Sequence, residues 1–166
     1  VPKSGVTMAG HAPLTIAMSG LYPPFNYYNE RNELVGFDVD IAREVARRLN
    51  RKPELITTAW DGIIAGLMAK KFDLIIGSMA ITDERLKSVS FSDPYYISGA
   101  QMVTRKGTTI ADAADLKGKV VGVTVGETYA EYVQENIPGV KRVNSYKGGV
   151  PSLLLMENAA RAAQQV

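Results

Sequence analysis

Apolar and polar residues alternate along this chain in two rhythms. Short apolar runs typical of strands are followed by longer segments in which apolar residues recur every three or four positions, as on one face of a helix. The predicted strands are residues 14–18, 55–58, 74–76, 119–124 and 141–146, and the predicted helices start near residues 38, 61, 82, 129 and 151. This alternation predicts an α/β fold built on parallel sheets with right-handed crossovers.

One apolar run leads directly into a short turn with polar residues beyond it. Leu74, Ile75 and Ile76 are uninterrupted by polar residues, and the run ends at Gly77 and Ser78. An unbroken run is typical of a strand buried on both faces rather than a strand at a sheet edge. We therefore expect this strand inside the parallel sheet, with functional residues just beyond its end.

Three polar residues mark where helices should begin. Asp38, Asp61 and Thr82 each suit the N-cap position. Behind Asp38, apolar residues follow helical spacing on one face and the arginines face water. Residues 27–35 predict a small hairpin, and residues 1–13 predict a loose arm.

Arg85 breaks a local rule of helix composition. It follows Thr82, Asp83 and Glu84, so it lies about one turn into a predicted helix, where a cation opposes the helix dipole. A broken local rule at the end of a buried strand indicates function. Arg85 either donates two hydrogen bonds to a ligand carboxylate or is neutralised by Asp83, Glu84 or Asp93.

Composition excludes several classes of protein. The chain has 166 residues, of which 46% are hydrophobic and 22% charged, as in an ordinary globular protein. Its 19 basic residues are scattered among 17 acidic ones, so we expect no nucleic-acid partner. Without cysteine there is no disulfide framework or thiolate zinc site. No apolar run reaches the roughly 20 residues of a spanning helix, and any targeting segment is expected to have been removed.

Reaction chemistry is poorly supported by the residues. The one histidine, His11, lies in the predicted arm, and the chain has no Gly-x-Ser-x-Gly elbow and no phosphate-binding loop. Asp38 and Asp40 are two apart on a helix, so they do not face each other as an acid/base pair would. We therefore expect no catalytic residue, no metal and no cofactor.

Six motifs, all in the same order, resemble landmarks of the polar-amino-acid binding proteins that serve ABC importers. They are Tyr22-Pro-Pro-Phe25, Gly36-Phe-Asp-Val-Asp-Ile41 continuing to Leu49, Trp60-Asp-Gly-Ile-Ile64, Ile81-Thr-Asp-Glu-Arg85, Phe91-Ser-Asp-Pro-Tyr-Tyr96 and Leu116-Lys-Gly-Lys-Val-Val-Gly-Val123. The likeness runs from about residue 14 to residue 155. Agreement of independent motifs in both order and spacing makes the resemblance specific.

The resemblance implies an α/β, periplasmic-binding-protein-like two-lobed fold. After the arm, residues 14–106 would form a nearly complete first lobe and residues 107–166 an incomplete second lobe. A free amino acid would be held between the lobes and delivered to the permease of an ABC transporter. The expected location is periplasmic, or extracellular and associated with the membrane.

The resemblance also implies which residues bind the ligand: Tyr22, Trp60, Ser78, Met79, Ala80, Arg85, Thr124, Gly126 and Thr128. Tyr22 and Trp60 would enclose the ligand side chain, unless they are ordinary core residues. Backbone groups of Ser78 and Ala80 would take the amine. Arg85 and the backbone amides around residues 126–128 would take the carboxylate, as a guanidinium and a helix N-terminus suit an anion.

Two departures from the family pattern bear on which ligand is expected and how tightly it binds. Ser19 stands where relatives that bind basic ligands carry aspartate, Ala80 replaces a serine or threonine, and Thr124 replaces a lysine or another long polar residue. We therefore expect an amino acid with an uncharged side chain. The chain also lacks the family's Gly-Arg-x-Asp-Ala strand, whose carboxylate neutralises the ligand ammonium, so we expect weak or no affinity.

The predicted second lobe has strands near Val121 and Val143 and little sequence to flank them. Either partner chains supply the missing elements, or the last helix packs in an unfamiliar way, or the chain is a fragment. Residues 153–156 of the predicted terminal helix form an apolar patch. We expect self-association, most simply a homodimer through the second lobes or through exchange of that helix.

Two other functions stay open at this point. A cyclohexadienyl or arogenate dehydratase uses the same fold, and turnover of prephenate or arogenate would identify it. The sensory ectodomain of a receptor is the other alternative, and it would need flanking membrane segments.

Overall fold

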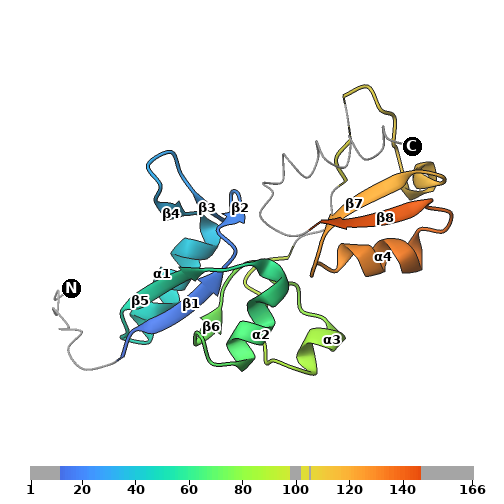
Figure 1. Cartoon of the computed structure of the whole chain (residues 1–166). Helices are drawn as coiled ribbons and strands as arrows, with labels where there is room; N and C mark the ends of the chain where they lie inside the picture. Colours follow the sequence, from blue (N-terminus) through green and yellow to red (C-terminus); the bar gives the residue numbers. More distant parts are fainter. Residues whose placement is uncertain (1–11, 98–101, 105, 147–166) are drawn as a thin grey trace. The chain divides into compact units, whose positions relative to one another are not determined.

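A computed structural model describes residues 12–97, 102–104 and 106–146 of the chain (Figure 1). These residues form two compact units. The first unit holds the residues up to Thr58 together with Gly62–Met79, and the second holds Ala59–Asp61 and the residues from Ala80 onward. The lobe boundary near residue 106 stays a prediction. The predicted terminal helix with its apolar patch, His11 and most of the predicted arm lie outside the described residues.

The first unit is built on a parallel three-stranded sheet. Its strands are β1 (Leu14–Met18), β5 (Pro53–Thr57) and β6 (Leu74–Ile75), in the order β5-β1-β6 (Figure 1). Ile16, Ala17 and Met18 of β1 have no exposed surface. Strand β1 is the middle strand of this sheet, and α1 packs against it.

The expectation that residues 74–76 form an inner strand is wrong for the part of the chain that the structure describes. Strand β6 pairs with β1 alone, and Leu74 and Ile75 are only half-buried. Ile76, directly after the strand, is the buried member of the run. The apolar run is explained by packing of Ile76 in the core of the first unit, although β6 is an edge strand of the described sheet. The middle strand of that sheet is β1.

Among its described residues, the first unit has the helices α1 and α2. Helix α1 (Phe37–Arg48) buries Val39, Ala42 and Ala46 against β1, as its apolar spacing predicts. Helix α2 (Ile63–Met68) follows the single turn η1 (Trp60–Gly62).

Neither predicted aspartate caps these helices, so both cap predictions are wrong. The N-cap positions are Gly36 and Gly62, without a side-chain hydrogen bond. Asp38 lies within the first turn of α1 and is fully buried. Asp61 lies inside the turn that precedes α2.

The predicted hairpin is confirmed and gains a third strand. Strands β2 (Leu21–Tyr22), β3 (Asn26–Tyr28) and β4 (Leu34–Val35) form a small antiparallel sheet in the order β2-β3-β4. The proline-containing turn between β2 and β3 places the aromatic segment of residues 22–25 beside α1, since Phe37 N–H donates to the Pro24 carbonyl.

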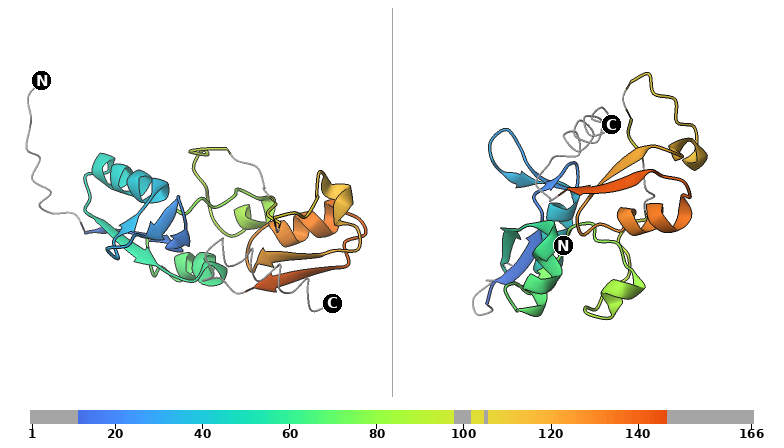
Figure 2. Two further views of the ribbon diagram at one scale, coloured as in Figure 1. Left: turned by 90° about the horizontal axis from the view of Figure 1, so that it is seen from above. Right: turned by 45° about the vertical axis from the view of Figure 1, so that its right-hand side comes forward.

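The second unit is built on two parallel strands, β7 (Val120–Thr124) and β8 (Arg142–Tyr146). Its helical segments are α3 (Asp83–Leu86), η2 (Ala113–Leu116) and α4 (Tyr129–Asn136). Helix α4 runs alongside the strands (Figure 1, Figure 2), and its residue Val133 and the adjoining Ile137 join Leu116 in a small core. The predicted helix 129–136 is confirmed, and each strand starts one residue later than predicted.

None of the helices in the described ranges is long and apolar enough to cross a lipid bilayer.

Candidate ligand-binding site

A polar network with a buried centre lies where β1 and β6 of the first unit end. The Asp38 carboxylate, which has no exposed surface, accepts a hydrogen bond from Asn26 Nδ2 at 2.7 Å. Ser78 Oγ donates to the same carboxylate, 2.8 Å from one oxygen and 2.9 Å from the other. Asn26 Oδ1 in turn accepts from Ser19 Oγ at 3.0 Å and from Gly20 N at 2.8 Å. The network therefore joins both strand ends to α1 and β3.

Ser78 has an unusual backbone conformation. Its φ of 56° is in the left-handed region, which costs a residue with a Cβ roughly 1–2 kcal/mol. Gly77 before it is buried, while Met79 after it is half-buried. The chain thus turns sharply on leaving β6, at the residues predicted to meet the ligand amine.

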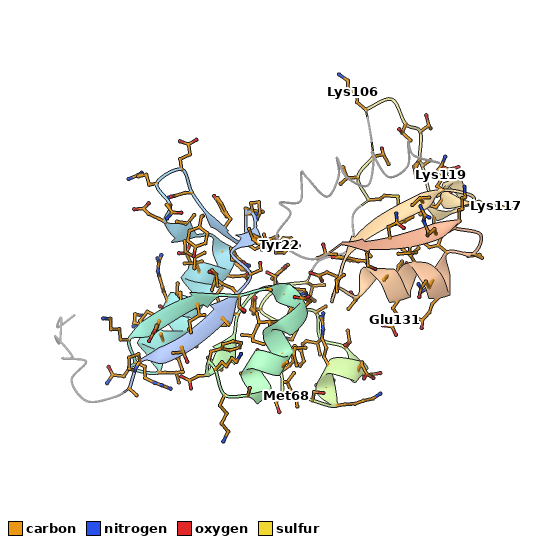
Figure 3. All side chains as sticks on the ribbon, in the orientation of Figure 1. Tyr22, Met68, Lys106, Lys117, Lys119 and Glu131 are labelled. Atoms are coloured by element: carbon orange, nitrogen blue, oxygen red, sulfur yellow. The ribbon has the colours of Figure 1, made fainter. Side chains whose placement is uncertain are left out.

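Tyr22 is at the edge of the hairpin sheet rather than in the core. Tyr22 lies on β2 (Figure 3) and is 37% exposed. Its ring stacks on Phe25 with centroids 4.8 Å apart. Phe25 also contacts Phe37 edge to face, with centroids 6.3 Å apart. The stack fixes one face of the Tyr22 ring by aromatic packing.

Arg85 of the second unit lies in a single-turn helix. Thr82 caps α3, because its Oγ1 accepts from the Arg85 backbone N–H at 3.2 Å, which confirms that prediction. Since α3 has four residues, Arg85 is in its last turn. Since this single turn is also the first turn of α3, the expected conflict with the helix dipole stays a prediction.

The half-buried Arg85 guanidinium is held by backbone carbonyls. Nη1 donates to the Ala80 oxygen and Nη2 to the Gly126 oxygen, each at 2.8 Å. Within the described ranges, neither Asp83, Glu84 nor Asp93 forms an ion pair with it. The alternative in which one of those acids neutralises Arg85 is therefore wrong.

Glu127 is the acidic residue that influences Arg85. Burial lowers the pKa of Arg85, and the charge of Glu127 partly opposes this change. Burial raises the pKa of the Glu127 carboxyl, and here the charge of Arg85 acts in the opposite direction. The two side chains thus share a partly desolvated environment, in which charge interactions are stronger than in water.

Gly126 brings Trp60 to the same region of the second unit. Its φ of 84° requires a left-handed backbone, and a methyl group added there would lie 3.5 Å from Trp60 Cδ1 and 3.3 Å from Asp61 Cα. Glycine therefore suits both the turn and the close approach. Trp60 itself is half-buried.

Thr124 and Thr128 flank this turn. The Thr124 carbonyl accepts from Glu127 N at 3.3 Å and closes the turn between β7 and α4. Thr128 is the N-cap residue of α4 but makes no side-chain capping bond. Both threonines are half-buried.

The predicted ligand-binding residues divide between the two units. The first unit holds Tyr22, Ser78 and Met79, and the second holds Trp60, Ala80, Arg85, Thr124, Gly126 and Thr128. Within the second unit the fold joins Arg85 to Ala80 and Gly126, and it places Gly126 against Trp60.

Sequence reasoning missed two residues at these positions. Asp38 is predicted as a helix cap, but it lies three and four positions before Ile41 and Ala42 and so falls on the apolar face of α1. A carboxylate on the apolar face of a helix is a signal of a buried polar group that can be read from the sequence. The sequence indicates only a turn at Glu127, because its closeness to Arg85 depends on a contact across 42 positions of the chain. In the described part of the chain, no group of three acidic or histidine side chains is arranged to hold a metal ion.

Comparison with known proteins agrees with this architecture. Residues 14–162 match the family described as bacterial extracellular solute-binding proteins, family 3. The chain is 43% identical over 129 residues to the L-cystine-binding protein TcyJ of Escherichia coli strain K12, covering 76% of this chain and 48% of that protein. It is 38% identical over 131 residues to ABC transporter arginine-binding protein 1 of the same strain, covering 79% and 54%. The chain thus spans about half the length of these relatives, which are named as binding proteins rather than enzymes.

A solved structure supports the fold. An ancestral arginine-binding protein bound to glutamine matches with a TM-score of 0.82 at 37% identity, over 90% of this chain and 66% of that one. The predicted two-lobed, periplasmic-binding-protein-like α/β fold is confirmed, and the match covers part of the complete fold. On the match of 149 consecutive residues, from 14 to 162, the chain belongs to family 3 of the bacterial extracellular solute-binding proteins.

Proposed function

We propose that this chain binds a free amino acid outside the cytoplasm and that Arg85 holds the ligand's α-carboxylate. The observation that carries the proposal is the half-buried guanidinium fixed by two backbone carbonyls. A guanidinium has five N–H donors in a rigid plane, so two of them anchor it and the others suit the two oxygens of a carboxylate.

The ligand amine is proposed to meet backbone groups of Ser78 and Ala80. Tyr22 and Trp60 supply aromatic surface for the ligand side chain, and the turn of residues 124–128 supplies further polar groups. The hydrogen bonds of Ser78 and the ring stack of Tyr22 hold these two side chains in place without a ligand. Preorganised groups of this kind lose little entropy on binding.

We further propose that the preferred side chain is uncharged. Ser19 carries no charge, and its hydroxyl is bonded to Asn26. Asp38 is the carboxylate in that network, and it is fully buried against Asn26 and Ser78. The relatives are named for cystine and for arginine, so they support an amino acid as the ligand class, and the departures in this chain support a neutral member of it.

Titration calorimetry tests the function. The chain is titrated with L-glutamine, L-cystine, L-arginine and L-histidine. Arg85→Ala should lose several kcal/mol of binding free energy, because a carboxylate would be buried without its partner. Arg85→Lys keeps the charge but loses the planar pair of donors, so we expect an intermediate loss.

Lys87→Ala is the matched control. Lys87 is two residues away and exposed, and its ammonium pairs with Glu84 rather than with the backbone carbonyls around Arg85. Removing it changes the net charge equally, so unchanged affinity would show that position matters rather than charge. Equal affinity of the Arg85→Ala variant and the unmodified chain would refute the assignment.

Delivery of the ligand to an ABC permease and formation of a homodimer are further proposals. Delivery to a permease is supported by membership of the solute-binding protein family and by a relative that is named as an ABC transporter binding protein. The sheet of β7 and β8, which has two strands among the described residues, supports the second, because so small a parallel sheet has little apolar surface to bury by itself. Light scattering over a dilution series tests the dimer, and a monodisperse species of 18.0 kDa at high concentration would contradict it.

A further inference from the structure

Glu127 directly follows the peptide group that holds Arg85. The Gly126 carbonyl, which accepts from Arg85 Nη2 at 2.8 Å, belongs to the peptide bond between Gly126 and Glu127. The Glu127 N–H donates to the Thr124 carbonyl at 3.3 Å, so the turn after β7 fixes the backbone of Glu127. The side chain of Glu127 therefore starts one peptide unit away from a carbonyl that anchors the guanidinium.

The Glu127 carboxylate is half-buried without an ion-pair partner. Within the described ranges it forms no ion pair, either with Arg85 or with another basic residue. Burial raises the pKa of Glu127, and the charge of Arg85 opposes this rise from beyond ion-pair distance. In a partly desolvated region an unpaired charge acts over a longer distance than it does in water.

Other groups of the second unit meet at the same turn. Burial, and then the charge of Glu127, raise the pKa of Tyr129 at the start of α4. A methyl group added at Gly126 would lie 3.7 Å from Asp61 Cβ, so Asp61 of η1 adjoins the turn as well. The turn thus brings one guanidinium, two carboxylates and one phenol into the same region, and the net charge of these groups is not positive.

This balance of charge bears on which ligands Arg85 can bind. In the proposed function the guanidinium of Arg85 holds the α-carboxylate, and the α-ammonium makes the ligand neutral as a whole. A ligand with a carboxylate in its side chain has a net negative charge, and the charge of Glu127 repels it. Like charges in a partly desolvated site disfavour each other strongly, because little water screens them.

We propose that Glu127 is a specificity-determining residue: its carboxylate excludes amino acids with an acidic side chain from the site that Arg85 forms. Glu127 acts through its charge and does not touch the ligand carboxylate held by Arg85. This inference rests on the proposed amino-acid binding. The neutral Ser19 bears on basic side chains, whereas Glu127 provides the corresponding selection against acidic ones.

Calorimetry at neutral pH with two pairs of ligands tests the inference. L-glutamine is compared with L-glutamate and L-asparagine with L-aspartate, because the members of each pair differ in charge and hardly in shape. The unmodified chain should prefer the amide of each pair about tenfold or more, the scale of one like-charge interaction in a partly desolvated site. Glu127→Gln removes the charge at nearly constant shape. It should reduce this preference about threefold or more, chiefly by raising the affinity for the acidic ligand.

Glu131→Gln is the matched control. Glu131 lies four positions further along, is exposed on α4 (Figure 3), and loses the same charge on substitution. We expect it to leave the preference for the amide unchanged. An equal reduction in Glu127→Gln and Glu131→Gln would show an effect of net charge alone and would overturn the inference.

Folding is checked by circular dichroism, and Glu127→Ala carries the test if Glu127→Gln does not fold. The full preference for the amide retained in the folded variant would overturn the inference. The proposed function would stand in that case if Arg85→Ala still lost affinity for L-glutamine. Equal changes in affinity for both members of a pair would show a structural role for Glu127 and would also overturn the inference. Binding of no amino acid by the unmodified chain would overturn both proposals.

Discussion

The two units of this chain differ in how completely their core residues are buried. In the first unit, β1 and α1 pack residues without exposed surface against each other, including Ile16, Met18 and Val39. In the second, two strands and α4 enclose Leu116 and Val133, which are 2% and 5% exposed. A hollow of about 280 Å³ also reaches the second core between α4 and β8. The core residues of the first unit are therefore more completely buried than those of the second.

The two units also differ in how the N-termini of their helices are capped. Helices α1 and α2 begin at glycines and have no side-chain cap. In the second unit, α4 likewise has no side-chain cap, but Thr82 caps α3, and Asp112 caps η2 while its own N–H donates to the Asp115 carboxylate. A short helix with little buried surface depends on its caps, whereas a helix with a deeply buried face does not.

The difference has a functional side. The first unit contributes a polar network whose members are mutually bonded and in which Asn26 and Asp38 are fully buried. The second contributes a cation and a glycine turn near its surface. Four comparisons of matched substitutions test how far this contrast extends.

The largest effect is expected from truncation of the two cores. Ile16→Ala should lower the free energy of unfolding of the first unit by about 4 kcal/mol, because the fully enclosed site cannot collapse around the cavity. Leu116→Ala should cost the second unit less, about 2–3 kcal/mol, since its surroundings are more open. Urea unfolding followed by hydrogen exchange measures each unit, and fluorescence of Trp60, the single tryptophan, reports the second. Equal costs would break the comparison.

Glycines with positive φ give the next contrast. A methyl group at Gly36, where φ is 125°, would overlap the Phe25 carbonyl and lie 2.7 Å from the Pro24 oxygen. Gly36→Ala should therefore destabilise the first unit by about 3 kcal/mol or more. Gly126→Ala meets no contact closer than 3.3 Å, so only the backbone strain of about 1–2 kcal/mol is expected. Thermal unfolding measures both, and a milder effect at Gly36 would contradict the structure there.

Two threonine N-caps sharpen the comparison within the second unit. Thr82→Ala removes the bond to Arg85 N–H and should destabilise α3 by about 1 kcal/mol. Thr128 starts α4, but its side chain makes no capping bond, so a smaller cost is expected for Thr128→Ala. Hydrogen exchange at residues 83–89 and 129–137 resolves the two helices. Similar losses would indicate that capping is not what stabilises α3.

The smallest effects concern pH, and their signs should be opposite in the two units. Burial raises the pKa of Glu127 above its ordinary 4.5, so its contribution to stability is present below that value and is lost as the pH rises through the folded pKa. The Thr15 N–H, 3.0 Å from Asp73 Oδ2, is the main cause of the lowered pKa of Asp73. Its contribution is present above pH 3.8 and is lost as the pH falls through the folded pKa.

Glu127→Gln and Asp73→Asn should remove these opposite slopes. The melting temperature measured from pH 3 to pH 8 should fall less on the alkaline side in Glu127→Gln and less on the acidic side in Asp73→Asn. Asp40→Asn, exposed on α1, serves as the control. Slopes of the same sign would mean that Glu127 is more solvated than the structure shows.

The sequence by itself predicted the elements whose signals are local. Periodicity located β1 and α4, the hairpin of residues 27–35 follows from a polar turn between apolar residues, and the Thr82 cap follows from residue type and position. Local signals suffice here because the spacing of apolar residues is a direct consequence of helix and strand geometry. The order of the motifs identified the family for the same reason, since each motif is a contiguous string.

The tertiary structure alone decided which strand lies inside the first sheet and where two charged side chains go. An apolar run records that a strand is buried but does not record its neighbours, so β1 rather than β6 is the inner strand. Asp38 fits a cap by residue type, yet its partners Asn26 and Ser78 lie 12 and 40 positions away. Arg85 meets the Gly126 carbonyl 41 positions along the chain. Such contacts form only when distant segments pack, because burial makes an unpaired charge costly and leaves it no partner but those that the fold brings near.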